Sequence, residues 1–312
     1  MKAKLAVSVC IILMTIMLFI PYTYAADNNV GIKVEFDKDK YVTGETATAT
    51  LTLTGLQDEK DANLSLGAFE THLKFNELPT EKNLEYVSDG SGFSSSLKTK
   101  LELESTATSG IIFGVAEADK NKNIFVISFD SQKGITLKDT VDTSGNLVIG
   151  TMKFKVNAEK GSMISVSIES DDNIESNNYT NVVTKPFGTE DKGEEYKCNV
   201  VEGGETSAQI VGAVMENPTA TFSGNTVNGS VDVRLPQSDS GVLFAVLRDT
   251  STGLIKQSKI EENVVASKTG YDVTFKGITN NSNLKIDYYL WKSFLNMQAM
   301  AEKVSAEVAP GN

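Results

Sequence analysis

The sequence predicts an all-β protein built from two antiparallel β-sandwich domains. Along most of the chain, apolar and polar residues alternate with a period of two, which is typical of strands that bury one face. Threonine, serine and valine dominate these segments, and glycine, asparagine and aspartate stand between them, where turns are expected. No helical period is evident, apart from a short turn expected within 296–304.

The first domain contains most of the expected strands. Segment 32–36 alternates strictly, and segment 46–56 continues the pattern with alanine and leucine on one face and threonine on the other. Further strands are expected over 68–75, 84–87, 111–116, 124–129, 147–156, 163–168 and 208–211. Short strands at this spacing, joined by turns, indicate an antiparallel sandwich.

The strand pattern stops at 212–218 and then resumes. Met215, Glu216, Asn217 and Pro218 do not continue a strand ladder, because proline cannot donate to one. New strands over 231–235, 242–247, 271–275 and 284–290 predict a smaller, Ig-like sandwich. We therefore expect a first domain over 30–212, a flexible linker over 213–218 and a second domain over 219–309.

The first 25 residues have the features of a secretory signal peptide. Lys2 and Lys4 precede an apolar run, and Thr23 and Ala25 supply the small residues of a cleavage site after Ala25. The apolar run is shorter than the roughly 20 residues that a membrane-spanning helix needs. We therefore expect a secreted, extracellular protein that keeps no membrane segment after cleavage.

Charge and cysteine content narrow the function further. The formal net charge of −12 becomes −14 without Lys2 and Lys4, and only two of the 29 basic residues are arginine. Nucleic-acid binding needs clustered lysine and arginine, and anionic membranes attract the same residues, so both partners are excluded. Cys198 is the single cysteine left after cleavage, so both domains must fold without an internal disulfide.

The sequence lacks the histidine and cysteine clusters and the nucleophile motif of common catalytic and zinc sites, although carboxylates are numerous, as in any acidic protein. His72 is the single histidine and stands within an expected strand, and no Gly-x-Ser-x-Gly motif occurs. One histidine and one distant cysteine cannot form a zinc site. The segment from Asp119 begins like a calcium loop, but Ile124 replaces the glycine of its sharp turn. We therefore expect a non-enzymatic binding protein without a cofactor or metal of its own.

The first domain resembles a cohesin module. The resemblance rests on a glycine turn at 41–45, a strand with an aromatic end at 67–76, and the Ile-Gly-Thr-Met-Lys-Phe-Lys-Val segment at 149–156. It covers residues 30–212 and departs from the family pattern at Asn76, where aspartate is common, and in a polar insertion over 171–202. It implies a jelly-roll sandwich that captures a dockerin-bearing protein in an extracellular, polysaccharide-degrading assembly. Calcium would enter only through the dockerin.

The resemblance also implies a binding face. Cohesins present one flat sheet face to the dockerin, which would correspond here to the strands over 68–75, 124–129, 147–156 and 163–168. Because side chains alternate across a strand, the apolar set enters the core and the other set faces outward. The outward set gives these candidate partner-binding residues: Glu70, His72, Lys74, Val126, Ser128, Thr151, Lys153, Ser165 and Ser167. An exposed Val126 among small polar residues suits a surface that a partner buries.

Two other functions stay open. A polysaccharide-binding module would stack sugars on exposed aromatic rings, but the only tryptophan, Trp291, has apolar neighbours that favour burial in the core. A passive structural protein of the cell surface would bind neither protein nor glycan. The second domain resembles a small sandwich recurrent in secreted bacterial surface proteins, through the segment 288–297, and this resemblance implies no activity. We expect the protein to be released or held non-covalently, since no apolar tail or lipid-bearing cysteine follows the signal.

Overall fold

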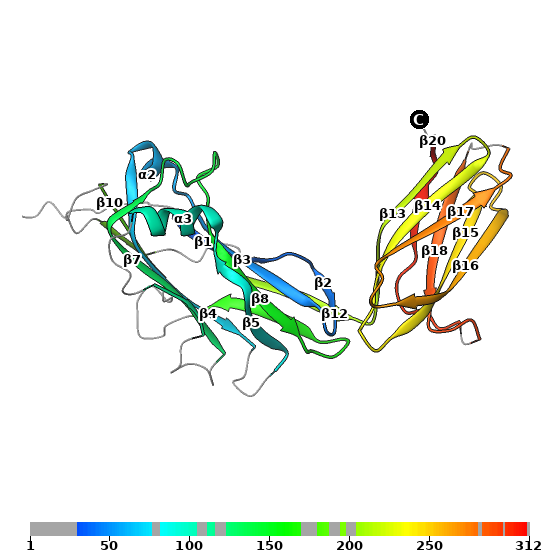
Figure 1. Ribbon diagram of the computed structural model, residues 1–312, viewed down its shortest axis with the longest axis horizontal. Helices are drawn as coiled ribbons and strands as arrows, with labels where there is room; N and C mark the ends of the chain where they lie inside the picture. The colour runs from blue at the N-terminus through cyan, green and yellow to red at the C-terminus, as the bar shows by residue number, and fades with distance from the viewer. Residues whose placement is uncertain are drawn as a thin grey trace, which may run out of the picture.

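The computed structural model describes residues 30–76, 82–104, 111–115, 123–169, 180–186, 194–197, 204–279, 283–295 and 297–310. They form two β-sandwiches that lie end to end (Figure 1). The predicted all-β fold is confirmed. The expected signal peptide, residues 119–122 of the calcium-like segment and Cys198 lie outside the described residues, whereas Ile124 and Asp130 of that segment belong to a strand over 124–136.

The smaller sheet of the first sandwich has four strands. Their order is β1-β3-β8-β5, and every neighbouring pair is antiparallel. The strands are β1 (Gly31–Phe36), β3 (Thr46–Thr54), β5 (Leu84–Phe93) and β8 (Leu147–Val156). Threonines of β3 face outward, and its alanines and leucines face the second sheet, as the alternation predicted.

The larger sheet of the first sandwich has eight strands. They run β11-β10-β4-β9-β12-β2, while β7 pairs with the other edge of β4, and β6 pairs with β7. The strands are β2 (Lys40–Val42), β4 (Leu64–Phe75), β6 (Ile112–Gly114), β7 (Ile124–Thr136), β9 (Met163–Ile168), β10 (Asn181–Pro186), β11 (Glu194–Lys197) and β12 (Glu205–Val211). Only β2 and β12 pair in parallel among these strands.

Aromatic rings from both sheets close the first core. Phe125 and Phe129 of β7 and Phe154 of β8 are at most 1% exposed. Phe154 packs against Phe75 with ring centroids 5.1 Å apart, and Tyr86 meets Phe125 edge-on at 4.9 Å. Each buried side chain of this size contributes about 1.5–3 kcal/mol. Both sheets of the first sandwich therefore pack on a closely packed aromatic core.

Two short helices depart from the prediction. Helix α2 (Gln57–Asp61) follows β3, and helix α3 (Ser95–Glu104) follows β5. Leu97 and Leu101, one helical turn apart, are 0% and 5% exposed and fix α3 to the core. The prediction of no helix in this part of the chain was wrong, because three leucines in ten residues leave too weak a periodic signal.

The second sandwich consists of two four-stranded sheets. Their orders are β17-β14-β13-β20 and β16-β15-β18-β19. The strands are β13 (Val214–Ser223), β14 (Thr226–Arg234), β15 (Ser240–Asp249), β16 (Ile255–Val265), β17 (Gly270–Lys276), β18 (Leu284–Trp291), β19 (Val304–Glu307) and β20 (Ala309–Pro310). Tyr288 is fully buried between the sheets and donates a hydrogen bond to the carbonyl of Thr219 at 3.1 Å.

The join between the sandwiches is shorter than predicted. β12 ends at Val211 and β13 begins at Val214, so 214–218 belong to a strand. Asn217, with φ of 51°, and Pro218 lie where the register between β13 and β14 shifts, which identifies a β-bulge. The predicted flexible linker over 213–218 was therefore wrong, because a bulge lets a strand continue through a proline.

Candidate protein-binding face

The outer surface of the larger sheet in the first sandwich is the candidate site. It is formed by outward side chains of β4, β6, β7 and β9, and we call it the β4 face: Glu70, His72, Lys74, Ile112, Val126, Ser128, Ser165 and Ser167. The strand register places Ser128 between Ile112 and Glu70, and Lys74 opposite Ser167. Seven of the nine predicted residues therefore share one continuous surface.

Strand β8 does not contribute to this face. It pairs with β3 and β5 in the opposite sheet, so Thr151 and Lys153 point outward on the far side of the sandwich. The backbone N–H of Lys153 donates to the hydroxyl of Ser91 on β5 at 2.8 Å. The prediction that Thr151 and Lys153 join the other residues was wrong. Alternation decides which way a side chain points along a strand, but it does not decide which sheet the strand joins.

The apolar part of the face also differs from the prediction. Val126 points outward but is only 6% exposed, so the expected exposed valine is buried. Ile112 on β6 is 43% exposed and lies opposite Ser128, and Met163 at the start of β9 is 57% exposed. The strand β6 was predicted from the sequence, but no local sequence feature indicates that it pairs with β7.

His72 lies between two carboxylates at the centre of the face. Its Nε2 is 3.1 Å from Glu70 Oε1, and its Nδ1 is 3.6 Å from Glu169 Oε2. The backbone N–H of Glu169 donates to the carbonyl of His72 at 2.9 Å, which joins the end of β9 to β4. Both ring nitrogens face acidic groups, so the imidazole is part of a charged cluster on the sheet surface. His72 is therefore suited to organising a charged surface.

The remaining side chains of the face are short and polar. Ser165 of β9 lies opposite Ser207 of β12, and Ser167 lies between Lys74 and Glu205. A surface of hydroxyl groups lies close to the backbone and lets a flat partner approach. Ile112 and Met163 add apolar area, of the kind that protein interfaces bury.

The described residues offer no sign of a metal centre or a membrane span. Within these ranges, His, Cys, Asp and Glu do not gather in groups of three or more that could hold a metal ion. None of the described helices is long and apolar enough to cross a membrane.

A second exposed feature lies on the second sandwich. Tyr288 and Leu290 of β18 point into the core, whereas Tyr289 and Trp291 alternate with them and are partly exposed. Trp291 stacks on Phe244 of β15, with ring centroids 5.2 Å apart and planes 17° from parallel. We call Phe244, Tyr289 and Trp291 the Trp291 cluster. The predicted burial of Trp291 in the core was wrong, because this apolar run covers both faces of β18.

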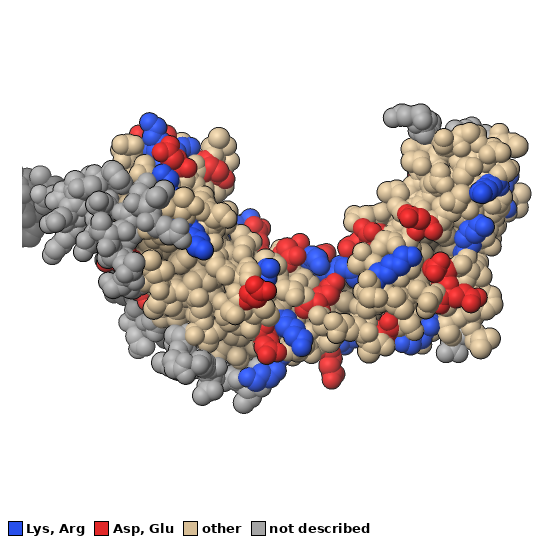
Figure 2. Space-filling view, in the orientation of Figure 1, with Lys and Arg blue, Asp and Glu red and all other residues tan. Residues whose placement is uncertain are grey.

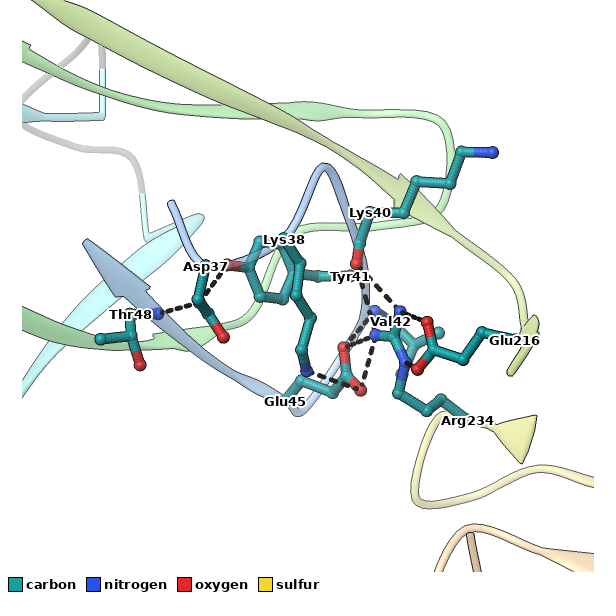
Figure 3. A network of polar contacts seen from close by, with 9 residues as sticks. All are labelled: Asp37, Lys38, Lys40, Tyr41, Val42, Glu45, Thr48, Glu216 and Arg234. Atoms are coloured by element: carbon teal, nitrogen blue, oxygen red, sulfur yellow. Dashed lines mark hydrogen bonds and ion pairs between the residues drawn. The ribbon is translucent and has the colours of Figure 1, made fainter. Parts of the chain in front are cut away.

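Arg234 fastens the two sandwiches together (Figure 3). Its Nε and Nη2 donate to the two carboxylate oxygens of Glu216 at 2.8 and 3.2 Å, and its Nη1 donates to those of Glu45 at 2.9 and 2.7 Å. Nη1 and Nη2 also donate to the carbonyl of Lys40 at 3.3 Å. Glu45 and Lys40 belong to the first sandwich, so one guanidinium group bridges both.

Glu45, one of the two carboxylate partners of Arg234, is itself held by a backbone hydrogen bond. The backbone N–H of Val42 donates to Glu45 at 2.9 Å, and the Arg234 side chain is only 10% exposed. Burial lowers the pKa of Arg234, but its hydrogen bonds to Glu216 and Glu45 outweigh burial and raise that pKa overall. Figure 2 shows acidic and basic side chains interspersed where the sandwiches meet. The sequence set Arg234 apart in one respect only, because it is one of two arginines in the chain.

Comparisons with known proteins give only weak likenesses. No protein-family model matches the chain, and no curated protein matches it. The type II cohesin dyad from the adaptor ScaA scaffoldin of Acetivibrio cellulolyticus is 14% identical, with a TM-score of 0.34, over 91% of this chain and 98% of that chain. The second type II cohesin module of the same scaffoldin is 15% identical, with a TM-score of 0.33, over 57% and 96%.

A pilin gives a weaker likeness. The full-length major pilin SpaD from Corynebacterium diphtheriae is 11% identical, with a TM-score of 0.26, over 84% of this chain and 56% of that chain. Identities and TM-scores this low do not establish membership of a family. The function therefore has to be argued from the residues of the chain itself.

Proposed function

We propose that the chain is a secreted, non-catalytic binding protein whose β4 face captures a dockerin-bearing protein. The observation that carries the proposal is the juxtaposition on one sheet surface of His72 with its two glutamates, the serines of β7 and β9, and exposed Ile112. The sequence resemblance of residues 30–212 to cohesins supports this class of partner. The assembly would be extracellular and polysaccharide-degrading, with calcium held by the dockerin.

The shape of the β4 face favours a macromolecular partner. A sheet surface offers area without enclosure, whereas small-molecule sites are concave and bury most of their ligand. Stable protein interfaces bury about 800 Å² on each partner. The strands β4, β7 and β9 rest on a closed aromatic core, so the face keeps its shape on binding.

Capture from the culture medium of the source organism tests the function. The immobilised chain, without residues 1–25, should retain dockerin-bearing proteins, identified by mass spectrometry, and release them when a calcium chelator is added. Release by a chelator is expected because the calcium belongs to the dockerin. Retention of other proteins only, or of none, would contradict the proposal.

The Trp291 cluster supports polysaccharide binding as a second candidate function. Exposed aromatic rings can stack on sugar rings, and stacking on Phe244 already orients the indole of Trp291. In that case Trp291→Ala should weaken retention on immobilised cellulose, xylan or wall glycan by about tenfold, or 1.4 kcal/mol. Ser128→Arg on the other sandwich is the matched control and should leave retention unchanged. Equal retention by wild type and Trp291→Ala would remove this candidate.

A further inference from the structure

The second sandwich has one long sheet edge without a partner strand in the described part of the chain. β16 ends its sheet and pairs only with β15 along its other edge. It has 11 residues, and all of them except Gln257, Val264 and Val265 are exposed. An edge of this kind presents unpaired backbone N–H and C=O groups, which can pair with another strand. We infer that β16 pairs with β16 of a second copy of this chain, forming a two-fold dimer.

An apolar row leads to this edge. Ile260 lies opposite Phe244 of β15, and Phe244 lies opposite Tyr289 of β18. The row therefore crosses three strands and stops at Ile260, which is 43% exposed. A second β16 placed alongside would cover Ile260 with its own Ile260 and continue the row across six strands, three from each copy.

The charges of β16 are self-complementary about Ile260. Residues directly opposite each other in an antiparallel pair lie on the same face of the sheet. With Ile260 on the two-fold axis, Lys259 lies opposite Glu261 of the second copy, and Glu261 lies opposite Lys259. An axis through Lys259 or through Glu261 would instead place like charges opposite each other, which is unfavourable. Of these three axes, the one through Ile260 is the one that pairs opposite charges, and we infer the register centred on it.

An alternative role for Lys259 and Glu261 is to prevent strand pairing, but their arrangement disfavours this role. Lys259 and Glu261 lie opposite Ala245 and Leu243, whose side chains face the core. Charges on the core-facing side of an edge strand commonly prevent pairing, because a partner would bury them uncompensated. Here the two charges are opposite in sign and symmetric about Ile260, so a second copy neutralises both. Neither forms an ion pair with another residue in the described ranges.

The dimer has a consequence for binding. It carries two β4 faces, so a partner with two dockerins, or a surface displaying many, would be held by both faces and released more slowly. This consequence rests on the proposed function, whereas the dimer itself does not. Oligomeric state is therefore the appropriate measurement, because it is independent of any partner.

Sedimentation velocity of the chain without residues 1–25, over a range of concentrations, tests the inference. Wild type should show a concentration-dependent dimer. Lys259→Glu should raise the dimer dissociation constant at least about tenfold, because the introduced glutamate meets Glu261 of the second copy. Combining Lys259→Glu with Glu261→Lys should restore the dimer, since the charges again alternate in sign across the axis.

A control variant separates pairing from general charge effects. Lys98→Glu on the exposed side of α3 makes the same charge change far from β16 and should leave the dimer unchanged. Far-UV circular dichroism of all variants should match wild type, because the altered side chains are exposed. A wild-type protein that stays monomeric at millimolar concentration would overturn the inference. A double reversal that fails to restore the dimer, while its fold is intact, would overturn the register.

Discussion

Asp287→Asn is expected to destabilise the second sandwich by about 2–4 kcal/mol. Asp287 is fully buried, yet it lies among three cationic groups: Arg248 Nη2 at 3.1 Å, Lys285 Nζ at 3.6 Å and Lys303 Nζ at 3.7 Å. The hydroxyl of Ser305 donates to it at 2.7 Å. Asparagine would leave three positive charges without their counter-ion. The partly exposed cations can still be solvated, which keeps the loss below that of a fully enclosed pair.

The same carboxylate makes stability depend on pH. Burial raises the pKa of Asp287, but the hydrogen bond from Ser305 and the three cations outweigh burial and lower that pKa below its ordinary value of 3.8. A carboxyl whose pKa is lower in the folded than in the unfolded state contributes stability that is complete above the unfolded pKa. That stability is lost as the pH falls through the folded pKa. Wild type should therefore lose stability below about pH 4, and Asp287→Asn should lose less.

Urea unfolding of the full mature chain at several pH values measures both effects. Asp272→Asn on β17 is the matched control, because this residue is exposed and the chemical change is the same. Its free energy of unfolding should stay within about 0.5 kcal/mol of wild type. An Asp287→Asn variant as stable as wild type at pH 7 would show that the three cations do not depend on this carboxylate.

Arg234→Ala is expected to loosen the fixed orientation of the two sandwiches relative to each other. Removal of the guanidinium deletes every hydrogen bond that links Glu45, Glu216 and the Lys40 carbonyl. It also leaves two carboxylates facing each other without the charge between them, so repulsion adds to the loss. The side chain of Arg234 is 10% exposed and binds both oxygens of two carboxylates. It should therefore contribute about 1–3 kcal/mol to holding the two sandwiches in one orientation.

Small-angle X-ray scattering measures this effect directly. Wild type should scatter as one elongated particle of fixed shape, and Arg234→Ala should show a broader distribution of interatomic distances. Arg234→Lys should give an intermediate result, because lysine keeps the charge but cannot bind two carboxylates in the same geometry. Lys256→Ala, which removes an exposed ion pair with Asp249, serves as the control. Identical profiles for wild type and Arg234→Ala would mean that other contacts fix the join.

Local alternation explains what the sequence could predict. The outward and inward sets along β4, β8 and β9 follow the period of two, so the directions of Glu70, Thr151 and Ser165 were correct from the sequence. Each direction depends only on the neighbouring residues of the same strand. Whether the candidates share one surface depends instead on strand pairing, which joins β4 to β7 and β9 in one sheet.

Non-local pairing explains what the sequence could not predict. The separation of Thr151 from the β4 face depends on β8 joining β3 rather than β4, and no residue of β8 encodes that choice alone. The burial of Val126 and the exposure of Ile112 likewise depend on the position of β6 at the sheet edge. Trp291 was misjudged because both faces of β18 carry aromatic residues. In such a strand, sequence periodicity does not show which side chains are buried and which are exposed.

Binding of a purified dockerin-bearing protein, measured by titration calorimetry, tests the central claim most directly. Ser128→Arg combined with Ser165→Arg places two long cations on the β4 face, while Thr151→Arg places one on the opposite sheet as a control. All three residues are partly exposed, so the fold should persist. The account predicts at least about a hundredfold loss of affinity for the double variant, or 2.7 kcal/mol, and none for Thr151→Arg. Unchanged binding by the double variant, or loss through Thr151→Arg alone, would contradict it.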